Sequence, residues 1–340
     1  MSRAIAIAAI ASAFVATGAA QQNRSETAGG DNDVHVLHVQ QNVYMLAGPG
    51  VNAAAQIGDE GIVVVDTMTA GSAEKLVNAI RTVSSKTILQ IINTHVHADH
   101  TGGNAIVANA GRYVTNAQNA RAAGFGAGAP ILSHENVQQR MTAESGKYKA
   151  SSDLWPTETY FEDQRDLFRN DESIEVLYQP NAHTGGDSLV YFRRSDVLVT
   201  GDVFTPQRYP VIDLEDGGSI NGLIAGINHI LRITVPSKNE EGGTYVIPGH
   251  GHLCDEADVS DYRDMVTIVR DRIQDAIKRK LTLEQVKAEK LTRDYDGVYA
   301  SAEYTGDMFV EAVYKSLTAS AAKAPVATAS PAKAPAGKKR

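Results

Sequence analysis

The chain of 340 residues has a single cysteine, Cys254, so no disulfide can form within it and the fold must rest on a hydrophobic core. Positive charge is not in excess either, because 40 acidic residues outnumber 32 lysines and arginines and give a formal net charge of −8. Without a basic field, nucleic acid is not expected as a partner. The length, with 43% hydrophobic and 21% charged residues, suits a soluble globular protein with one large domain or two small ones.

Long apolar runs are scarce, and the one at the amino terminus is short. Arg3 precedes the apolar, alanine-rich residues 4–15, and the small residues 18–20 follow. This order predicts a secretory signal peptide over residues 1–20 that is cleaved after Ala20. An uncleaved membrane anchor is the alternative, but the run is short for a bilayer span and has no cysteine to carry a lipid. We therefore expect a periplasmic or secreted protein without a stable membrane anchor.

Three further segments make up the mature chain. The polar residues 21–33 are expected to be a disordered lead-in, and residues 34–318 are expected to form one domain. Residues 319–340 are rich in alanine, proline and lysine and cannot bury a core, so we expect a disordered tail. The basic end of this tail is expected to be solvated, with contact to an anionic envelope surface as the alternative.

The spacing of apolar residues predicts an alternation of strands and helices. Strands are expected over residues 34–40, 42–47, 52–57, 61–66, 88–92, 112–115, 173–177, 188–192, 196–200 and 243–247. Helices are expected over residues 72–83, 103–110, 117–123, 220–231, 259–279, 283–289 and 306–318. Residues 124–160 carry only a weak helical pattern, and we expect an excursion over the mouth of a site there. The aromatic residues of this excursion, Trp155, Tyr160 and Phe161, either line a substrate cleft or pin the loop to the core.

Candidate chemistry is concentrated in residues 94–103, Thr-His-Val-His-Ala-Asp-His-Thr-Gly-Gly, which follow a short, apolar, β-branched segment. Alternate residues of extended backbone point to one side, so His95 and His97 can bind one metal ion. Asp99 and His100 stand where the chain turns, and they can serve a second ion nearby. A polar loop with coincidental histidines is the alternative. The spacing favours metal binding.

The second half of the chain supplies three more candidates, His183, Asp202 and His250, each near a glycine at the end of an apolar segment. Rigid strands can hold a ligand at their ends while glycine lets the backbone approach. Each residue alone could be an ordinary loop residue, but with the first stretch they complete a set of seven ligands. Arg208 and Tyr209, just beyond Asp202, are candidates to contact a substrate carboxylate.

Other residues of the same types are expected to be structural. Cys254 could be an additional ligand, but the set is already complete, so a small buried side chain is expected. His252 is expected either to support a ligand or to be exposed. Four histidines have no motif around them and are expected at the surface or in the core: His35, His38, His134 and His229.

The ordered set of candidates resembles the ligand pattern of the metallo-β-lactamase fold superfamily, and the resemblance extends from Val34 to the helix at Val259. It implies an α/β fold, an αβ/βα sandwich of two mixed sheets flanked by helices, with two metal ions at one edge of the sheets. By that resemblance, the first ion is held by His95, His97 and His183, the second by Asp99, His100 and His250, and both by a bridging Asp202.

The resemblance also implies a hydrolase with two Zn²⁺ ions, although a ligand set of nitrogen and oxygen admits iron or manganese. Two ions that share a water lower its pKa and make a hydroxide that attacks a carbonyl. Asp99 is then expected to orient this nucleophile and to pass its proton to the leaving group. The best-known subclass of true metallo-β-lactamases has cysteine where Asp202 stands, so the chain is more similar to the glyoxalase II, lactonase and general hydrolase branches.

The expected reaction is the opening of a small-molecule ester or amide, such as a β-lactam or a lactone, by an exported enzyme. A glyoxalase II-like thioesterase is less favoured, because glutathione thioesters are chiefly cytoplasmic. An iron-dependent persulfide dioxygenase is a redox alternative that metal analysis would separate from zinc hydrolysis. A non-catalytic binding protein on the same fold is a third class, which the complete ligand set disfavours. The oligomeric state and the natural substrate are left open.

Overall fold

Two β-sheets pack face to face in the computed structural model, which describes residues 32–112, 128–237 and 242–323. The first sheet has seven strands in chain order, antiparallel up to its fourth strand and parallel from there on. Its strands are β1 (His35–Gln40), β2 (Val43–Ala47), β3 (Asn52–Ile57), β4 (Ile62–Val65), β5 (Ile88–Ile92), β6 (Ile131–His134) and β7 (Glu158–Tyr160).

The second sheet has five strands in the order β12-β11-β10-β9-β8. They are β8 (Gln164–Arg169), β9 (Glu172–Gln179), β10 (Asp187–Phe192), β11 (Val197–Val199) and β12 (Tyr245–Ile247). The pair β11 and β12 is parallel, and the other pairs are antiparallel. Parallel strands β4 and β5 are buried along their whole length, which explains why both are predominantly apolar without the alternation of a half-exposed strand.

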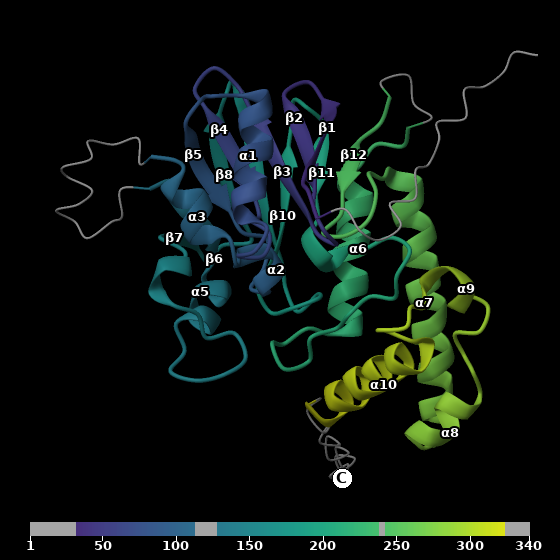
Figure 1. The fold of residues 1–340 in the computed structure, drawn as a ribbon. Helices are drawn as coiled ribbons and strands as arrows, with labels where there is room; N and C mark the ends of the chain where they lie inside the picture. Colours follow the sequence, from purple (N-terminus) through teal and green to yellow (C-terminus); the bar gives the residue numbers. More distant parts are fainter. Residues whose placement is uncertain (1–31, 113–127, 238–241, 324–340) are drawn as a thin grey trace, which may run out of the picture. The chain divides into compact units, whose positions relative to one another are not determined.

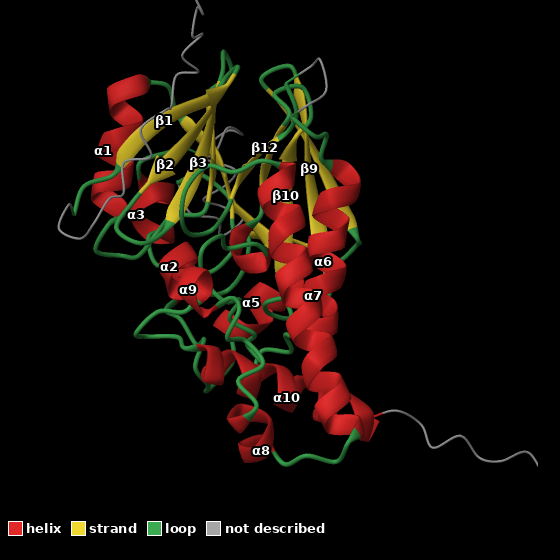
Figure 2. Ribbon diagram, turned by 90° about the vertical axis from the view of Figure 1, so that its right-hand side faces the viewer, coloured by secondary structure: helices red, strands yellow, loops and turns green. Residues whose placement is uncertain are grey.

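Helices cover the outer face of each sheet, as Figure 2 shows. On the first sheet lie α1 (Ala73–Val83) and α3 (Asn104–Asn109), and on the second lie α6 (Ile220–Ile233) and α7 (Glu256–Lys278). The apolar side chains between the two sheets form one core cluster, to which β4, β5, β10 and β11 contribute. The remaining helices of the described residues are α2 (Ala98–Thr101), α5 (Glu135–Met141), α8 (Leu283–Ala288), α9 (Asp296–Tyr299) and α10 (Gly306–Lys323), with short 3-10 turns η1 (Ser152–Leu154) and η2 (Gly201–Val203).

Most predicted elements are confirmed within one or two residues, but three strands were missed. β6 and β7 lie in the stretch with only a weak helical pattern, and β8 is a polar edge strand in which no residue is fully buried. Their strand structure comes from pairing with β5 and β9 rather than from local alternation. Of the expected strand over residues 112–115 only Arg112 is described, without regular structure, and the expected helix over residues 117–123 lies outside the described residues.

The ends of the predicted domain also differ in detail. Helix α7 begins at Glu256, three residues before the predicted start, because Asp255 caps it in a capping box. Helix α10 continues to Lys323, five residues past the predicted end at residue 318 and into the segment expected to be a tail. The predicted signal peptide and all but two residues of the predicted lead-in lie outside the described residues. Among the helices of the described chain, none combines the length and the hydropathy needed to cross a bilayer.

The aromatic residues of the excursion mostly pin it in place. Tyr160 is buried and its hydroxyl lies 2.6 Å from the Ser188 hydroxyl, while the indole N–H of Trp155 donates to the Ala150 carbonyl at 2.9 Å. Phe161 is 71% exposed. Trp155 therefore belongs to a small apolar cluster beneath the excursion rather than to an open cleft.

Candidate metal centre

The predicted motif stands directly after β5, where the chain leaves the first sheet. Asp66, at the end of the neighbouring strand β4, accepts hydrogen bonds from the Thr94 amide at 2.8 Å and from the Thr94 hydroxyl at 2.7 Å. Because β4 and β5 are parallel, both strand ends meet at the same edge of the sheet. The turn that follows needs Gly103, since a Cβ at this position would overlap the Thr67 carbonyl oxygen.

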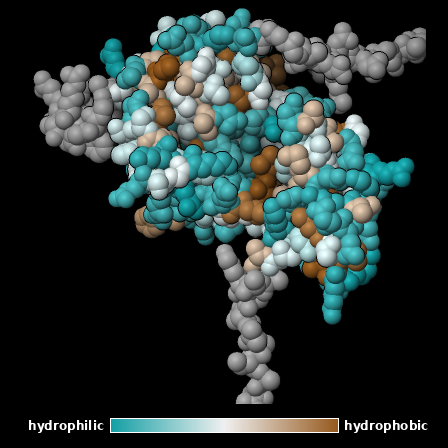
Figure 3. All heavy atoms as spheres, turned by 60° about the horizontal axis from the view of Figure 1, so that its bottom comes forward, coloured by the Kyte–Doolittle hydropathy of each residue, from teal (hydrophilic) through white to brown (hydrophobic). Residues whose placement is uncertain are grey.

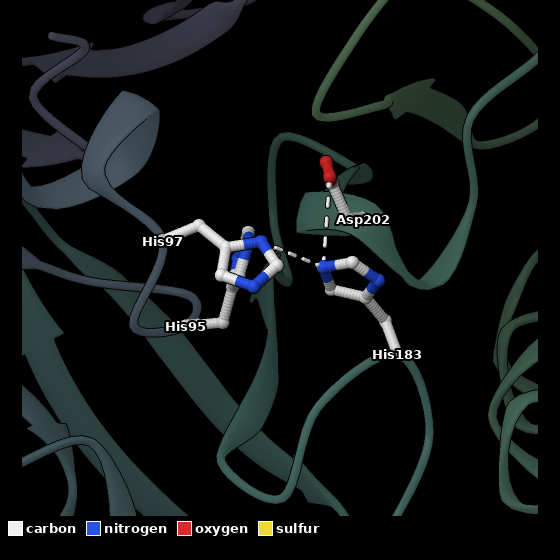
Figure 4. Close-up of side chains that lie close together, drawn as sticks. All are labelled: His95, His97, His183 and Asp202. Carbon is white, nitrogen blue, oxygen red and sulfur yellow. Dashed lines mark hydrogen bonds and ion pairs between the residues drawn. The ribbon is translucent and has the colours of Figure 1, made fainter. Parts of the chain in front are cut away.

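The first group of candidate ligands comes from three separate loops. Ligand atoms of His95, His97, His183 and Asp202 all lie within 4.8 Å of one another, and Figure 4 shows these side chains converging. His183 Nε2 lies 3.0 Å from His97 Nδ1 and 3.7 Å from Asp202 Oδ2. His183 follows β9 and Asp202 lies in η2 after β11, so both sheets contribute to this group.

In a second group, the ligand atoms of Asp99, His100 and His250 also lie within 4.8 Å of one another. This group contacts the first through Asp202. Asp202 Oδ2 lies 3.2 Å from His250 Nε2, and Asp202 Oδ1 lies 3.4 Å from His100 Nε2. A carboxylate that contacts both groups has the position expected of a bridging ligand. The structure thus brings together all seven residues that the sequence proposed as ligands.

Each histidine turns one ring nitrogen away from the centre toward a fixed partner. His183 Nδ1 lies 2.8 Å from the Val211 carbonyl oxygen, and His250 Nδ1 contacts the Gly50 carbonyl oxygen. His95 Nδ1 lies 3.0 Å from the Thr94 hydroxyl, whose own proton goes to Asp66. In each case the outward nitrogen can carry the proton, which leaves the lone pair of the other nitrogen facing the centre.

The chemistry of this donor set fits a cation. The buried atoms His95 Nε2, His100 Nε2 and Asp202 Oδ1 make no hydrogen bond, although buried polar atoms are nearly always paired. They are three of the atoms that converge in the two groups. Neutral imidazole and ionised carboxylate are the ligands that zinc and related ions prefer.

Burial and charge shift the pKa values of His95, His183 and Asp202 toward the form that binds metal, and those of His100 and His250 in the opposite direction. Burial and neighbouring histidines lower the pKa of His95 well below its usual value, and burial lowers the pKa of His183 to about 4. Burial acts to raise the pKa of Asp202, but the positive charges of His250 and His100 outweigh it and hold this pKa well below the usual value. His100 moves in the opposite direction: burial acts to lower its pKa, and the carboxylates of Asp66 and Asp202 raise it overall.

Of the two proposed substrate contacts, Tyr209 is buried and Arg208 is partly exposed. Tyr209 has no exposed surface, and its hydroxyl donates to Asp296 Oδ1 at 2.8 Å, with the Thr292 carbonyl oxygen at 3.1 Å. This is a packing position among the C-terminal helices, in contrast to the expected contact with a substrate. Arg208 is partly exposed, and its charge acts on Tyr262, a buried residue of the same helical cluster.

Three residues near the site were missed by the sequence analysis. Asp213 Oδ2 lies 3.1 Å from His97 Nε2 and 3.2 Å from the Lys147 ammonium nitrogen. The Tyr148 hydroxyl lies 3.3 Å from His97 Nε2, and its ring stacks on the imidazole with centroids 5.4 Å apart. No strand precedes these residues and no motif surrounds them. Asp66, by contrast, carried a signal, because a carboxylate ends an apolar strand beside the motif.

A third group of potential ligands, His252, Cys254 and Asp258, lies at the start of α7. Cys254 is buried, as expected, and Asp258 accepts a hydrogen bond from the Asp255 amide within the capping box. The positive end of the helix dipole opposes a cation at this position. We therefore assign this group to the N-terminus of α7 and not to a metal ion.

The sequence matches a known protein family and a curated relative. The family model described as "Metallo-beta-lactamase superfamily" matches residues 39–252. The alpha subunit of 2,4-dinitroanisole O-demethylase from a Nocardioides species is 28% identical over 159 residues, which are 46% of this chain and 42% of that protein. This chain therefore spans less than half the length of that curated relative.

Solved structures share the fold at low sequence identity. The sec-alkylsulfatase Pisa1 from Pseudomonas sp. superposes with a TM-score of 0.62 at 17% identity, over 83% of this chain and 50% of that one. A metallo-beta-lactamase from Pontibacter korlensis superposes with a TM-score of 0.50 at 16% identity, over 69% of this chain and 99% of that one. These matches confirm the predicted sandwich of two mixed sheets flanked by helices.

Proposed function

Because the chain belongs to the metallo-beta-lactamase superfamily, whose members are metal-dependent hydrolases, we propose that it is an exported hydrolase with two metal ions. The observation that carries this proposal is the placement of Asp202 between the two ligand groups. The first ion would be held by His95, His97, His183 and Asp202, and the second by Asp99, His100, His250 and Asp202. Zn²⁺ suits this set of imidazoles and carboxylates, and iron or manganese is the alternative.

The protein residues divide the work at this site. When bound, a pair of such ions polarises the scissile bond and lowers the pKa of a water. The buried imidazoles of His95 and His183 remain neutral and hold their positions through hydrogen bonds on the outer nitrogen. Asp99 is the most exposed member of the set, with 38% of its side chain accessible, and its Oδ2 lies 3.5 Å from His250 Nε2. From this position Asp99 can accept a proton and return it to a leaving group.

A small substrate with an apolar part is favoured. Figure 3 brings forward the end of the sheets at which α2 lies, and on this face a group of hydrophobic residues lies between hydrophilic parts of the surface. Binding sites for small molecules combine apolar surface with a few polar groups that orient the ligand. We propose an ester or amide that includes a β-lactam or a lactone.

The test is turnover by the purified mature protein with its metal content measured. The panel contains a cephalosporin, a penicillin, several lactones, an aryl ester, a thioester, a secondary alkyl sulfate and 2,4-dinitroanisole. Hydrolysis of lactones or β-lactams is the expected result. Iron in the site together with no hydrolysis of any substrate would replace the proposal with the persulfide dioxygenase alternative.

Substitution of one ligand checks the site itself. His97→Ala should abolish turnover and lower the metal content, because it removes a nitrogen donor from the first group. His252→Ala is the matched control, since His252 is exposed and lies two residues beyond His250. Activity that is unchanged in His97→Ala would refute the assignment of the site.

Export is a separate part of the proposal. It rests on the charged start, the apolar run and the small residues before Gln21. Sequencing the amino terminus of protein recovered from the periplasm or medium should give Gln21 as the first residue. Recovery of the chain from the cytoplasm with residues 1–20 still attached would contradict export and leave the hydrolase proposal standing.

A further inference from the structure

We infer that Asp213 is a positioning residue that orients His97 for its metal ion and at the same time fastens residues 146–148 beside the site. The inference rests on the proposed metal-dependent function and adds to it a residue outside the ligand motif. Asp213 lies in the loop between η2 and α6, far along the chain from both groups that it contacts.

The hydrogen bond to Asp213 determines which nitrogen of His97 can bind a metal. An ionised carboxylate only accepts, so the contact of 3.1 Å requires the proton on His97 Nε2 and leaves a lone pair on Nδ1. His183 carries its own proton on Nδ1, because its partner there is the Val211 carbonyl. Two lone pairs, His97 Nδ1 and His183 Nε2, therefore face each other across 3.0 Å (Figure 4). A cation between them relieves this repulsion.

Asp213 is itself held rigidly. Its Oδ1 accepts hydrogen bonds from the amides of Glu215 at 3.2 Å and Asp216 at 3.1 Å. Its own amide donates to the His183 carbonyl at 2.9 Å, and only 5% of its side chain is accessible. A group fixed in this way can fix the imidazole that it contacts.

The same carboxylate connects the metal ligand to the excursion over the site. Lys147 lies 3.2 Å from Asp213 Oδ2 and compensates its charge, while Tyr148 stacks on His97 at an interplanar angle of 27°. Tyr148 also packs on the apolar cluster around Val96, a residue between two of the ligands. The orientation of His97 is thus coupled to the position of this segment.

A comparison within the site shows why the effect should be confined to one ion. His100, in the second ligand group, has an equivalent carboxylate partner in Asp66 at 2.7 Å. Each ligand group therefore contains one histidine supported by a carboxylate, and the two carboxylates, Asp213 and Asp66, lie on different loops. A carboxylate behind a ligating histidine raises its basicity and fixes its tautomer, and loss of such a partner typically costs about 10–100-fold in metal affinity.

The experiment is a competition titration of metal-free, full-length protein with Zn²⁺ and a chelating dye. Asp213→Asn should bind one of two ions about 10–100-fold more weakly than the wild type and the other ion equally well. Glu215→Gln is the matched control, because its exposed carboxylate is two residues away. Two ions bound with wild-type affinities by Asp213→Asn would overturn the inference while leaving the hydrolase proposal intact. A wild-type chain that binds no ion would refute both.

A second measurement needs no Asp213 variant and reports the tautomer of His97 directly. In ¹⁵N-histidine NMR spectra of the metal-free wild type, with His97 assigned by its loss in His97→Ala, we expect the proton on Nε2. A proton on Nδ1 would overturn the inference whatever the stability of the Asp213 variant. A purely structural role for Asp213 would not determine this signature.

Discussion

The atom behind each histidine decides which ring nitrogen faces the centre of the site. Carbonyl and carboxylate oxygens only accept, so their imidazole partner must donate and its other nitrogen is left as a base. Four histidines have such an oxygen partner: His97, His100, His183 and His250. The site is therefore prepared for metal by acceptors that lie outside the ligand motif.

Tyr209 provides a prediction at the scale of a single residue. Its hydroxyl is buried and donates to Asp296, and its ring stacks on Phe309 with centroids 4.9 Å apart. Tyr209→Phe keeps the ring and leaves the partly buried Asp296 carboxylate without this donor, so the free energy of unfolding should fall by about 1–2 kcal/mol. Urea denaturation measures this change, and kcat/KM should stay at the wild-type value. A loss of kcat/KM with unchanged stability would instead support contact with a substrate.

The sequence was sufficient to predict which side chains converge at the site but not the residues that support them. His95, His97, Asp99 and His100 are close together in the chain, and the other three candidates follow apolar strands, so spacing and strand ends reveal them. Asp213 reaches His97 across more than a hundred residues, through a loop without regular pattern. Contacts of this kind depend on how the two sheets pack, which a local pattern does not encode.

At the scale of elements, burial on both faces made the central strands easy to predict. β4, β5 and β10 are completely buried, and their sequences are predominantly apolar. β8 was not predicted, for the opposite reason. It is an edge strand with charged and polar residues, and only its pairing with β9 defines it. The helix α10 extends past the predicted end because alanine-rich sequence propagates a helix once its first turns are packed on α7.

The attachment of α10 to α8 provides a prediction of pH dependence. Hydrogen bonds from Lys287 and Lys315 lower the pKa of Glu311 to about 2, below its ordinary value of 4.5. The charged form is therefore favoured by folding, and its contribution is present above about pH 4.5 and lost as the pH falls toward 2. Because the pair is partly exposed, Glu311→Gln should cost at most about 1 kcal/mol at pH 7.

Urea midpoints measured for the wild type and Glu311→Gln between pH 2 and pH 7 check this prediction. The difference between the two proteins should shrink below pH 4.5, and it should also shrink in high salt. Glu303→Gln, a substitution in the turn before α10, serves as the control. A difference that stays constant across the pH range would show that the ion pair does not hold α10 in place.

At the scale of the whole molecule, the two halves meet at the metal site as well as in the core. His95, His97, Asp99 and His100 follow a strand of the first sheet, whereas His183, Asp202 and His250 follow strands of the second. The apolar cluster between the sheets lies behind the site and contains none of these residues. The core can therefore hold the fold without metal, while bound metal adds a further link between the sheets.

Removal of metal should accordingly lower stability without unfolding the chain. A ligand that binds only the folded state, at a concentration of about 1,000 times its Kd, adds about 4 kcal/mol to the free energy of unfolding. For a domain of this size, that raises Tm by on the order of 5–10 °C. Treatment with EDTA should lower Tm by this amount and leave the far-UV circular dichroism at 25 °C unchanged, and added Zn²⁺ should restore the original value. In His97→Ala the shift should be smaller, because one of its two ligand groups is incomplete. Complete loss of secondary structure in EDTA would mean that the sheets depend on metal to stay together, whereas an unchanged Tm in a protein shown to have bound metal would mean that the site adds no link between them.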